Sequence, residues 1–483
     1  MLGLRGRKLE RGMAQAASYE EWRESAMAYD KWAGHERWKR MDQSRSFDYL
    51  SIRLRLDRLR QLRARHDYAG LLFTLNEGIH GNMGGMGRSQ LYDRARFGTK
   101  QLINDYVEEI NDALELIAGV ELEGVTQEQK VDFLERARHC FGQSALMMSG
   151  SGMLLYFHVG VVKALWQQRL LPDILSGSSG GSFVGSFLAT HSDKELEKLF
   201  DANFLVHEIE QEKRRFGMLD KISPQVLQID EIKAIVERLV PDMTFQEAYQ
   251  KTGRLMNISI APAETHQTSR LLNATTSPNV LIRESILASG AVPGVYPPVM
   301  LMARDNYGEK KEYLPSRKWV DGAISDDLPA KKLARLYGVN HFIVSQTNPH
   351  IIPFITDAKR GGRVTSVLRV AATRTAREWL NAGALIAQKP LAKRPRLHQL
   401  TTTALAIINQ DYVGDINILP PFRFYRPTRL LAHLSKAEIN ALIDMGERST
   451  WPKIEMIRLQ TRISRTLGRL CKELEASYPA LKN

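Results

Sequence analysis

Residues 173–186 constrain the fold and chemistry of this chain more than any other stretch. A short apolar run enters a cluster of small residues in which Gly177, Ser179 and Gly181 fit the pattern G-x-S-x-G, and an apolar helix-like run follows. A strand, a sharp turn and a helix in this order are typical of a nucleophile elbow. Only glycine fits on either side of the serine in so tight a turn. The N–H group of Gly180 is then expected at a helix N-terminus, where partial positive charge favours a developing oxyanion.

A second glycine-rich loop precedes the elbow. Residues 149–152 read Ser-Gly-Ser-Gly, between a short apolar strand and an amphipathic helix expected at 160–170. A glycine loop between strand and helix exposes backbone N–H groups, which suits a further oxyanion donor. An ordinary strand-to-helix turn is the alternative interpretation.

Two downstream segments complete the pattern. Trp319 and Val320 form a short strand that runs into Asp321 and Gly322, so the aspartate lies at a strand end where it can meet a serine from another strand. The alternative is a plain Asp-Gly turn. Residues 285–298 form a short helix followed by an apolar segment bent by proline and glycine, which we expect to be the packed wall of a pocket without chemistry of its own.

Taken together, five short elements resemble the patatin-like phospholipase family. In chain order they are Ser-Gly-Ser-Gly (149–152), Gly-Val-Val-Lys-Ala-Leu (160–165), Gly-Ser-Ser-Gly-Gly (177–181), Ala-Ser-Gly-Ala-Val-Pro-Gly (288–294) and Asp-Gly-Ala (321–323). Residues 19–116, which include Asn-Met-Gly-Gly-Met-Gly at 82–87, are similar to the helical domain that precedes the patatin domain in triacylglycerol lipases of fungi and plants.

The resemblance implies a Ser–Asp dyad in which Ser179 is the nucleophile and Asp321 is the base. It implies an oxyanion hole formed by four residues: Gly150, Ser151, Gly152 and Gly180. The family's glycine triplet reads Gly-Ser-Gly here, and a backbone N–H of Ser151 can donate if its φ is negative. The implied activity is hydrolysis of carboxylic esters of triacylglycerol or phospholipid through an acyl-enzyme. An acyltransferase using the same dyad and a catalytically weak lipid-binding scaffold are the alternatives.

A Ser-Asp-His triad of the α/β-hydrolase type is a rival interpretation, because four histidines follow the aspartate: His341, His350, His398 and His433. The spacing argues against this triad. Gly150 precedes Ser179 by only 29 residues, one helix and one strand, whereas in an α/β-hydrolase more chain separates such a loop from the elbow. For His341, which begins a predicted strand, we expect a hydrogen bond at the strand end.

Composition narrows the remaining classes. The chain has 483 residues, 43% of them hydrophobic, and a mean hydropathy of −0.30, so we expect a globular protein of two or three domains. Residues 1–12 are basic without an apolar core, so we expect no signal peptide and a cytoplasmic protein. His158 and Lys163 interrupt the apolar stretch 144–166, which argues against a membrane span. Only two cysteines occur and no metal motif is present, so we expect neither cofactor nor metal.

Positive charge is concentrated in the flanks. Residues 1–70 hold 16 basic against 10 acidic side chains and residues 350–483 hold 22 against 10, within a whole-chain net charge of +13. Basic flanks with interleaved apolar residues, as in Val364–Gln388, suit the anionic surface of a bilayer or droplet, so we expect peripheral membrane contact. A solvated basic face on a packed helix is the alternative. A pI near 9.6 also fits nucleic acid, but no recognition motif supports that partner, and the sequence gives no oligomeric state.

The expected fold class is α/β, with a mainly parallel sheet flanked by helices. Six strands are expected, at 145–148, 173–176, 255–261, 318–321, 341–346 and 415–419. Four regions are expected: a flexible tail at 1–18, a helical N-terminal domain at 19–140, a patatin-like catalytic domain at 141–420 and a helical C-terminal region at 421–483. Residues 389–400 are expected to form a basic linker or an insertion.

Overall fold

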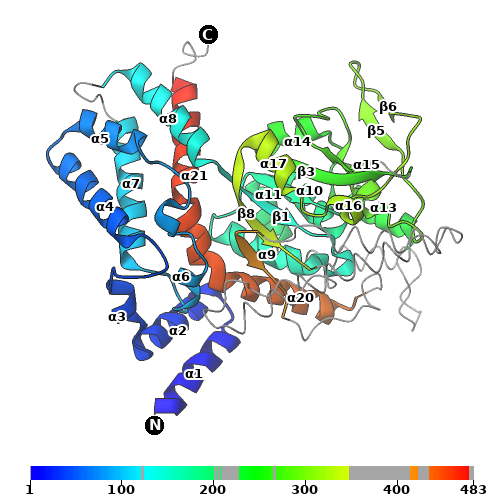
Figure 1. Cartoon of the computed structure of the whole chain (residues 1–483). Helices are drawn as coiled ribbons and strands as arrows, with labels where there is room; N and C mark the ends of the chain where they lie inside the picture. Colours follow the sequence, from blue (N-terminus) through cyan, green and yellow to red (C-terminus); the bar gives the residue numbers. More distant parts are fainter. Residues whose placement is uncertain are drawn as a thin grey trace, which may run out of the picture. The chain divides into compact units, whose positions relative to one another are not determined.

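The computed structural model of the chain describes residues 2–119, 125–200, 228–264, 268–347, 414–421 and 434–477, together with residues 121, 204 and 207 (Figure 1). Val364–Gln388, the predicted linker at 389–400, and His350, His398 and His433 lie outside the described residues. The chain divides into two compact units. The helical unit comprises Met1–Ser144, Ala334–His341 and Trp451–Asn483, and the sheet unit comprises Ala145–Leu333 and Phe342–Thr450.

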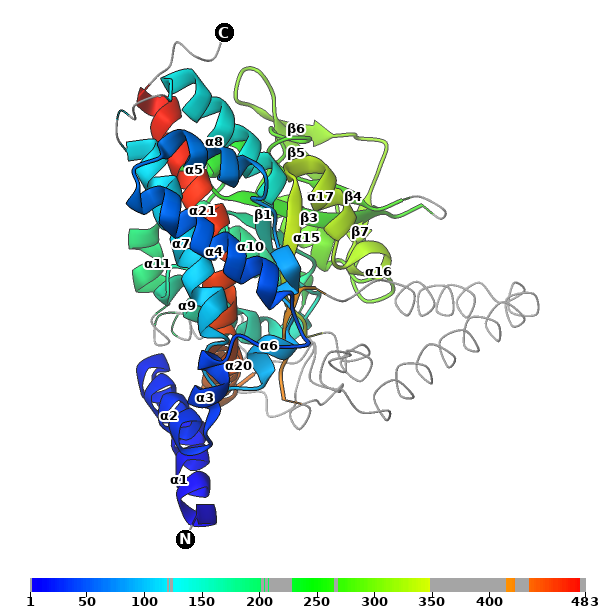
Figure 2. The same ribbon diagram turned by 60° about the vertical axis from the view of Figure 1, so that its left-hand side comes forward.

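Long amphipathic helices build the helical unit. Its helices are α1 (Leu2–Gln15), α2 (Tyr19–Trp32), α3 (His35–Arg40), α4 (Tyr49–Ala64), α5 (Tyr68–Asn76), α6 (Gln90–Asp93), α7 (Gln101–Gly119), α8 (Gln127–Phe141) and α21 (Ile454–Ser477), with short 3₁₀ turns η1 (Met83–Gly85) and η5 (Trp451–Lys453). The centre of the unit is α7, which packs against α4, α5 and α21 (Figure 2). Its buried face includes Ile103, Tyr106, Ile110 and Leu114 at helical spacing.

Side-chain caps mark where several of these helices begin. At the start of α2 the Ser18 hydroxyl accepts a hydrogen bond from the N–H of Glu21. At the starts of α4 and α5 the carboxylates of Asp48 and Asp67 accept hydrogen bonds from the N–H groups of Ser51 and Gly70, respectively. Each cap satisfies an N–H group that has no partner within its own helix.

The extreme N-terminus differs from the flexible tail predicted at 1–18. Leu2–Gln15 form helix α1, which packs on α2. The fit depends on small residues, because a Cβ on Gly6 would overlap the Trp32 ring and one on Gly12 would lie 3.0 Å from Ser25 Oγ. The pairing with α2 was not visible in the local pattern of α1.

The sheet unit is built on a seven-stranded sheet. Its strands are β1 (Gln143–Met148), β2 (Ile174–Gly177), β3 (Leu255–Pro262), β4 (Arg270–Leu272), β7 (Trp319–Asp321), β8 (Val339–Ser345) and β9 (Ile416–Ile418). They follow the order β4-β3-β2-β1-β8-β9, and β7 also pairs with β3. The β1–β2, β2–β3 and β8–β9 pairs are parallel, whereas β4 and β7 run antiparallel to β3. The predicted α/β class with a mainly parallel sheet is confirmed. A separate hairpin pairs β5 (Leu301–Arg304) with β6 (Lys310–Tyr313).

Helices accompany the sheet as predicted. They are α9 (Leu155–Gln167), α10 (Gly180–Thr190), α11 (Asp193–Leu199), α13 (Ile229–Leu239), α14 (Phe245–Thr252), α15 (Ile282–Gly290), α16 (Ala323–Asp326), α17 (Ala330–Tyr337) and α20 (Lys436–Thr450). The helix expected at 160–170 begins earlier, at Leu155, directly after a short 3₁₀ turn, η2 (Gly152–Leu154). Helix α10 packs on β2 and β3, which fixes the direction in which it leaves the elbow.

Helix α20 crosses α9 at very close range. A Cβ on Gly160 would overlap the Ile443 carbonyl, and a Cβ on Gly446 would overlap the Phe157 carbonyl. Beside this contact, Lys163 Nζ and Glu447 Oε1 form an ion pair of 2.6 Å with both side chains largely buried. The glycine and lysine of the 160–165 element thus serve helix packing.

The single helical C-terminal region predicted at 421–483 is divided in the structure. Helix α20 packs on α9 in the sheet unit, whereas α21 packs on α7 and α8 in the helical unit. Helix α21 buries an apolar face that includes Ile457, Leu467 and Leu470.

Candidate active site

Ser179 occupies the turn between β2 and α10. Its φ of 50° and ψ of −122° place a non-glycine residue in a strained region of backbone space. The turn is possible only because Gly177 and Gly181, two residues before and two residues after Ser179, have no side chain. A Cβ on Gly177 would overlap the Gly181 carbonyl, and one on Gly181 would overlap the Met148 carbonyl. The predicted elbow, with Gly177 and Gly181 flanking Ser179, therefore has the geometry that the pattern indicated.

The first turn of α10 leaves one N–H group available at the elbow. The N–H of Gly181 donates to the Ser178 carbonyl and that of Ser182 to the Ser179 carbonyl. No acceptor for the Gly180 N–H is present among the described residues. A helix N-terminus carries partial positive charge, so this N–H suits a developing negative oxygen.

The glycine loop lies against the elbow. A Cβ on Gly180 would overlap Ser151 Oγ and would lie 2.9 Å from the Gly152 carbonyl oxygen. Ser151 has a φ of −139°, so a residue with a side chain is accommodated there, and Gly152 has a φ of 49°, which favours glycine. Across the described part of the chain, the N–H groups of Ser151 and Gly152 have no acceptor.

Gly150 is engaged differently from the sequence-based expectation. Its N–H donates to Asp327 Oδ1 at 2.7 Å, so the structure directs this group to a buried carboxylate instead of the elbow. Gly150 still lies beside the nucleophile, because a Cβ on it would be 3.8 Å from Ser179 Cβ. The sequence could not reveal this contact, since Asp327 is 177 positions away.

Asp321 ends β7 and is buried, with 5% of its surface exposed. Its Oδ1 accepts the N–H of Ala323 at 2.8 Å. Burial raises the pKa of Asp321 to about 7, and the hydrogen bond from Ala323 opposes that rise. Gly322 allows the chain to turn here, because a Cβ on it would overlap the backbone of Ser259 and Ile260.

The register of the sheet brings Ser179 and Asp321 to the same level. Gly177, the last residue of β2, pairs with Ile258 of β3, and Asp321 pairs with Ile260, two residues further along β3. Ile260 also pairs with Arg270 of β4, which lies on the side of β3 opposite β2, so β7 joins β3 on the same side as β2. Asp321 therefore lies just past the end of β2, where the chain turns at Ser179. Within the described residues no direct hydrogen bond joins Ser179 Oγ to the carboxylate of Asp321.

Sequence reasoning missed the role of the C-terminal end of α15, where Ser289 lies in the last turn and Ala291 is the C-cap. The Ser289 hydroxyl accepts the Ser179 N–H at 2.9 Å and donates to the Ser259 carbonyl at 2.8 Å. Two residues later, the Ala291 carbonyl accepts the N–H of Asp321 at 3.0 Å. The wall predicted at 285–298 therefore holds the backbones of both predicted dyad residues. The only signal in the sequence was the single serine within the small-residue run 288–291.

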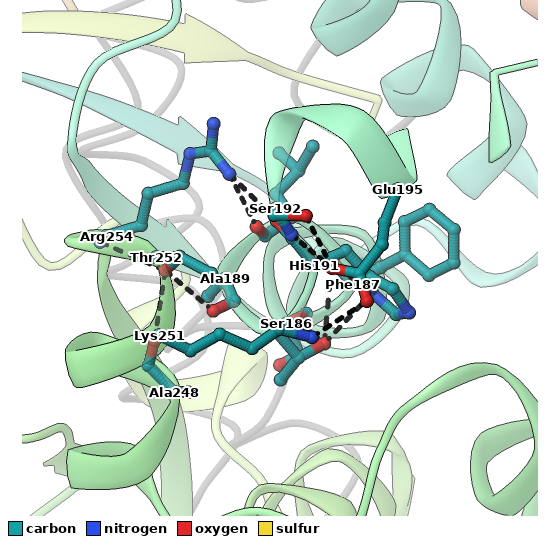
Figure 3. A network of polar contacts seen from close by, with 12 residues as sticks. Ser186, Phe187, Ala189, His191, Ser192, Glu195, Ala248, Lys251, Thr252 and Arg254 are labelled. Carbon is teal, nitrogen blue, oxygen red and sulfur yellow. Dashed lines mark hydrogen bonds and ion pairs between the residues drawn. The ribbon is translucent and has the colours of Figure 1, made fainter. Parts of the chain in front are cut away.

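The far end of α10 is held by a polar network (Figure 3). The Arg254 guanidinium donates to the Leu188 and His191 carbonyls, and the Thr252 hydroxyl donates to the Ala189 carbonyl. These bonds satisfy carbonyls that a helix C-terminus leaves without partners, and the cation complements the negative end of the helix. The helix that begins at the elbow is thus anchored at both ends.

The rival triad receives no support from His341. Its Nδ1 lies 3.0 Å from Ser144 Oγ and its Nε2 lies 2.8 Å from Gln460 Oε1. The structure therefore shows the hydrogen bonding expected of a histidine at a strand start.

The described residues contain no cluster of three or more histidine, cysteine, aspartate or glutamate side chains that could hold a metal ion. No helix in the described ranges is both long and apolar enough to cross a bilayer.

Comparisons with known proteins place the chain among lipases and phospholipases by similarity. Residues 146–334 match the model of patatin-like phospholipases, and residues 3–139 match a domain of unknown function, DUF3336. Triacylglycerol lipase SDP1L of Arabidopsis thaliana is 31% identical over 470 residues, which cover 94% of this chain and 57% of the relative. Triacylglycerol lipase 4 of Saccharomyces cerevisiae is 32% identical over 468 residues, or 92% of this chain and 50% of the relative.

Triacylglycerol lipase ptl2 of Schizosaccharomyces pombe is 30% identical over 486 residues, which cover 96% of this chain and 75% of the relative. The chain spans about half the length of the first two relatives and three quarters of the third. Among solved structures, VipD from Legionella pneumophila matches at a TM-score of 0.27 and 14% identity, covering 63% of this chain and 67% of that one, which is too weak to carry an argument. With the elbow, the glycine loop and the Asp-Gly-Ala turn brought together on one sheet, the extent of the third match shows that the chain belongs to the patatin-like phospholipase family.

Proposed function

We propose that this protein is a carboxylic ester hydrolase that cleaves acyl esters of triacylglycerol or phospholipid. The observation that carries the proposal is the strained Ser179 at the start of α10, with the N–H groups of Gly180, Ser151 and Gly152 beside it. The substrate class is suggested by the relatives, which are named triacylglycerol lipases, and by the patatin-like phospholipase match.

In the proposed reaction, Ser179 Oγ attacks the ester carbonyl and Asp321 takes its proton. The N–H groups stabilise the tetrahedral oxyanion. As this intermediate collapses, Asp321 returns the proton to the leaving alkoxide, which departs as the alcohol and leaves an acyl-enzyme. Water attacks the acyl-enzyme to release the fatty acid and regenerate the serine. Asp321, ionised again, takes a proton from the attacking water and returns it to Ser179. A base with a pKa of about 7 is suited to this task near neutral pH. The proton transfer needs the serine and the carboxylate to approach each other when substrate binds, as catalytic hydrogen bonds often tighten only in the complex.

The direct test is covalent labelling by a fluorophosphonate together with hydrolysis of a long-chain ester. Wild type is expected to be labelled, and Ser179→Ala is expected to lose both labelling and hydrolysis. Ser464→Ala removes a serine hydroxyl on α21 that donates to the Thr461 carbonyl, and it serves as the control that should retain both. Equal hydrolysis by wild type and Ser179→Ala would refute the proposal.

An acyltransferase would use the same nucleophile, with an alcohol or a lysolipid in place of water. The burial of Asp321 favours neither acceptor. Product analysis with and without added lysolipid separates the two reactions, because transfer consumes the lysolipid while hydrolysis leaves it unchanged.

We also propose peripheral contact of the helical unit with an anionic lipid surface. Helix α1 presents exposed cations on its surface: Arg5, Arg7, Lys8 and Arg11. An exposed leucine accompanies them on α1, Leu4 at 73% exposure. Basic and apolar side chains on one helix surface are typical of binding at a lipid interface.

Flotation with vesicles tests this contact. Replacing Arg5, Arg7 and Lys8 by glutamate should weaken binding to vesicles that contain phosphatidylserine. The control replaces three exposed cations of the sheet unit, Lys194, Lys331 and Lys251, by glutamine and should bind as wild type. Equal binding of wild type to neutral and anionic vesicles would contradict the electrostatic part of the proposal.

A further inference from the structure

One peptide group of the glycine loop is held at both of its polar ends. The carbonyl oxygen of Ser149 lies 3.0 Å from His158 Nε2, and the N–H of Gly150, in the same peptide group, donates to Asp327 Oδ1 at 2.7 Å. His158 and Asp327 are both buried, with 0% and 1% of their surfaces exposed. A peptide group is planar, so hydrogen bonds to its carbonyl oxygen and from its N–H together restrain the orientation of the plane.

The hydrogen bonds of His158 define its protonation. A carbonyl oxygen can only accept, so Nε2 carries the hydrogen, and Nδ1, 2.6 Å from Ser345 Oγ, accepts from that hydroxyl. Burial lowers the pKa of His158 to about 4, which keeps the ring neutral at neutral pH. The ring therefore has a fixed tautomer and a fixed direction of donation.

Neighbouring hydroxyls support the same loop. The Thr347 N–H donates to Ser149 Oγ at 2.9 Å, and the Ser149 N–H donates to the Ser345 carbonyl at 3.1 Å. These bonds tie the start of the loop to the end of β8. The loop is also closely packed where it meets Asp327. A Cβ on Gly150 would lie 3.1 Å from Ala323 Cβ and 3.5 Å from Asp327 Oδ1.

We propose that His158 and Asp327 are positioning residues that clamp the Ser149–Gly150 peptide and so aim the N–H groups of Ser151 and Gly152 at the oxyanion. The inference rests on the proposed ester hydrolysis for its catalytic consequence. Neither side chain donates to the substrate, because the ring and the carboxylate each face the loop backbone. Their effect reaches the reaction through the orientation of the next two peptide groups.

Paired substitutions separate this role from simple packing. Glutamine at 158 retains an amide donor that can reach the Ser149 carbonyl, whereas leucine removes it. Asparagine at 327 retains an acceptor for the Gly150 N–H, whereas alanine removes it. His158→Leu and Asp327→Ala are expected to lower kcat by about tenfold to a hundredfold with KM within about threefold, because loss of an oxyanion donor costs about 10²–10³. His158→Gln and Asp327→Asn are expected to recover most of that loss.

Amide hydrogen exchange provides a readout that does not need catalysis. Exchange of the Gly150 and Leu154 N–H groups, which donate to Asp327 Oδ1 and to the Ser151 carbonyl, should accelerate by at least tenfold in His158→Leu and in Asp327→Ala, and much less in His158→Gln and Asp327→Asn. If one variant does not fold, the other still tests the opposite end of the same peptide.

The outcomes separate the clamp from the reaction. Unchanged loop exchange in folded variants, or equal loss in the conservative and non-conservative pairs, would overturn the clamp. An inactive wild type that shows the expected exchange pattern would refute the proposed hydrolysis and still support the clamp.

Discussion

Asp321 combines two properties that oppose each other at the scale of a single residue. In its proposed role as general base Asp321 must lose its proton, yet the burial that raises its pKa to about 7 disfavours the charged form. The sheet tolerates this cost because the residue is fixed between the Ala291 carbonyl and the Ala323 N–H. Strain at Ser179 is tolerated in the same way, since Ser289 holds its N–H. Both are expected of a site in which local stability is given up for reactivity.

The raised pKa of Asp321 predicts how stability depends on pH. An unfolded aspartate loses its proton near 3.8, whereas the folded one holds it to about 7. Between these values the folded state binds more protons, so this residue's contribution to stability falls as pH rises through the window and is lost above it. Asp321→Asn removes the buried charge, so it should melt several degrees above wild type at pH 8, with the difference shrinking towards pH 4.

Thermal denaturation from pH 4 to pH 8 measures this effect, with exposed Asp57→Asn as the control that should follow wild type. A constant difference in melting temperature across the range would contradict the assignment. In wild type, kcat/KM should rise with pH and level off above about 7, because only the ionised carboxylate accepts the proton.

Ser289 predicts a second residue-scale effect. Ser289→Ala leaves the Ser179 N–H without its acceptor, and a lost buried hydrogen bond costs about 1–3 kcal/mol. We expect kcat to fall by roughly tenfold to a hundredfold. Ser285→Ala is a matched control, because that buried hydroxyl lies one turn earlier on α15 and donates to the Leu281 carbonyl of its own helix. Equal activity of the two variants would show that Ser289 does not position the nucleophile.

At the scale of elements, local patterns predicted what local forces determine. The strands observed at Gln143–Met148 and Ile174–Gly177 lie within two residues of the predicted bounds, because short apolar runs between turn residues carry that signal. Partners distant in sequence carried no such signal. Nothing near Gly160 indicated that Ile443 would pack on it, and nothing near Gly150 indicated that Asp327 would bind its N–H. The elbow could be predicted because the glycines that its sharp turn requires lie within five consecutive residues, 177–181.

The contact between α9 and α20 predicts an element-scale effect. Gly446→Ala places a methyl group into the Phe157 carbonyl, and overpacking of this kind costs about 1–3 kcal/mol. Gly468→Ala on α21 is the matched control, since a Cβ there meets nothing within 4 Å, and removing a glycine from a helix should stabilise by up to about 1 kcal/mol. Urea denaturation should therefore shift the two midpoints in opposite directions. A midpoint for Gly446→Ala at or above that of wild type would contradict the close packing.

At the scale of the whole molecule, the last residues of the chain belong to the same helical unit as the first. The last helix, α21, packs on α7 and α8, and the Thr466 hydroxyl donates to Asn111 Oδ1 of α7. The match to DUF3336 stops at residue 139, so the helical unit is completed by residues that the family model does not include. The sheet unit carries all the predicted site residues.

Leu467 tests this division, because it is fully buried on α21 within the helical unit. Leu467→Ala should cost about 2–5 kcal/mol by leaving a cavity in that unit. Hydrogen exchange should then accelerate in α7, α8 and α21, while α9 and α10 retain their protection and Ser179 is labelled by fluorophosphonate at the wild-type rate. Leu54→Ala, which truncates an exposed leucine on α4, should change neither measurement. Labelling that slowed in proportion to the lost stability would show that the two units unfold cooperatively. In that case a cavity made in α21 would destabilise the elbow, although no element of the elbow lines that cavity.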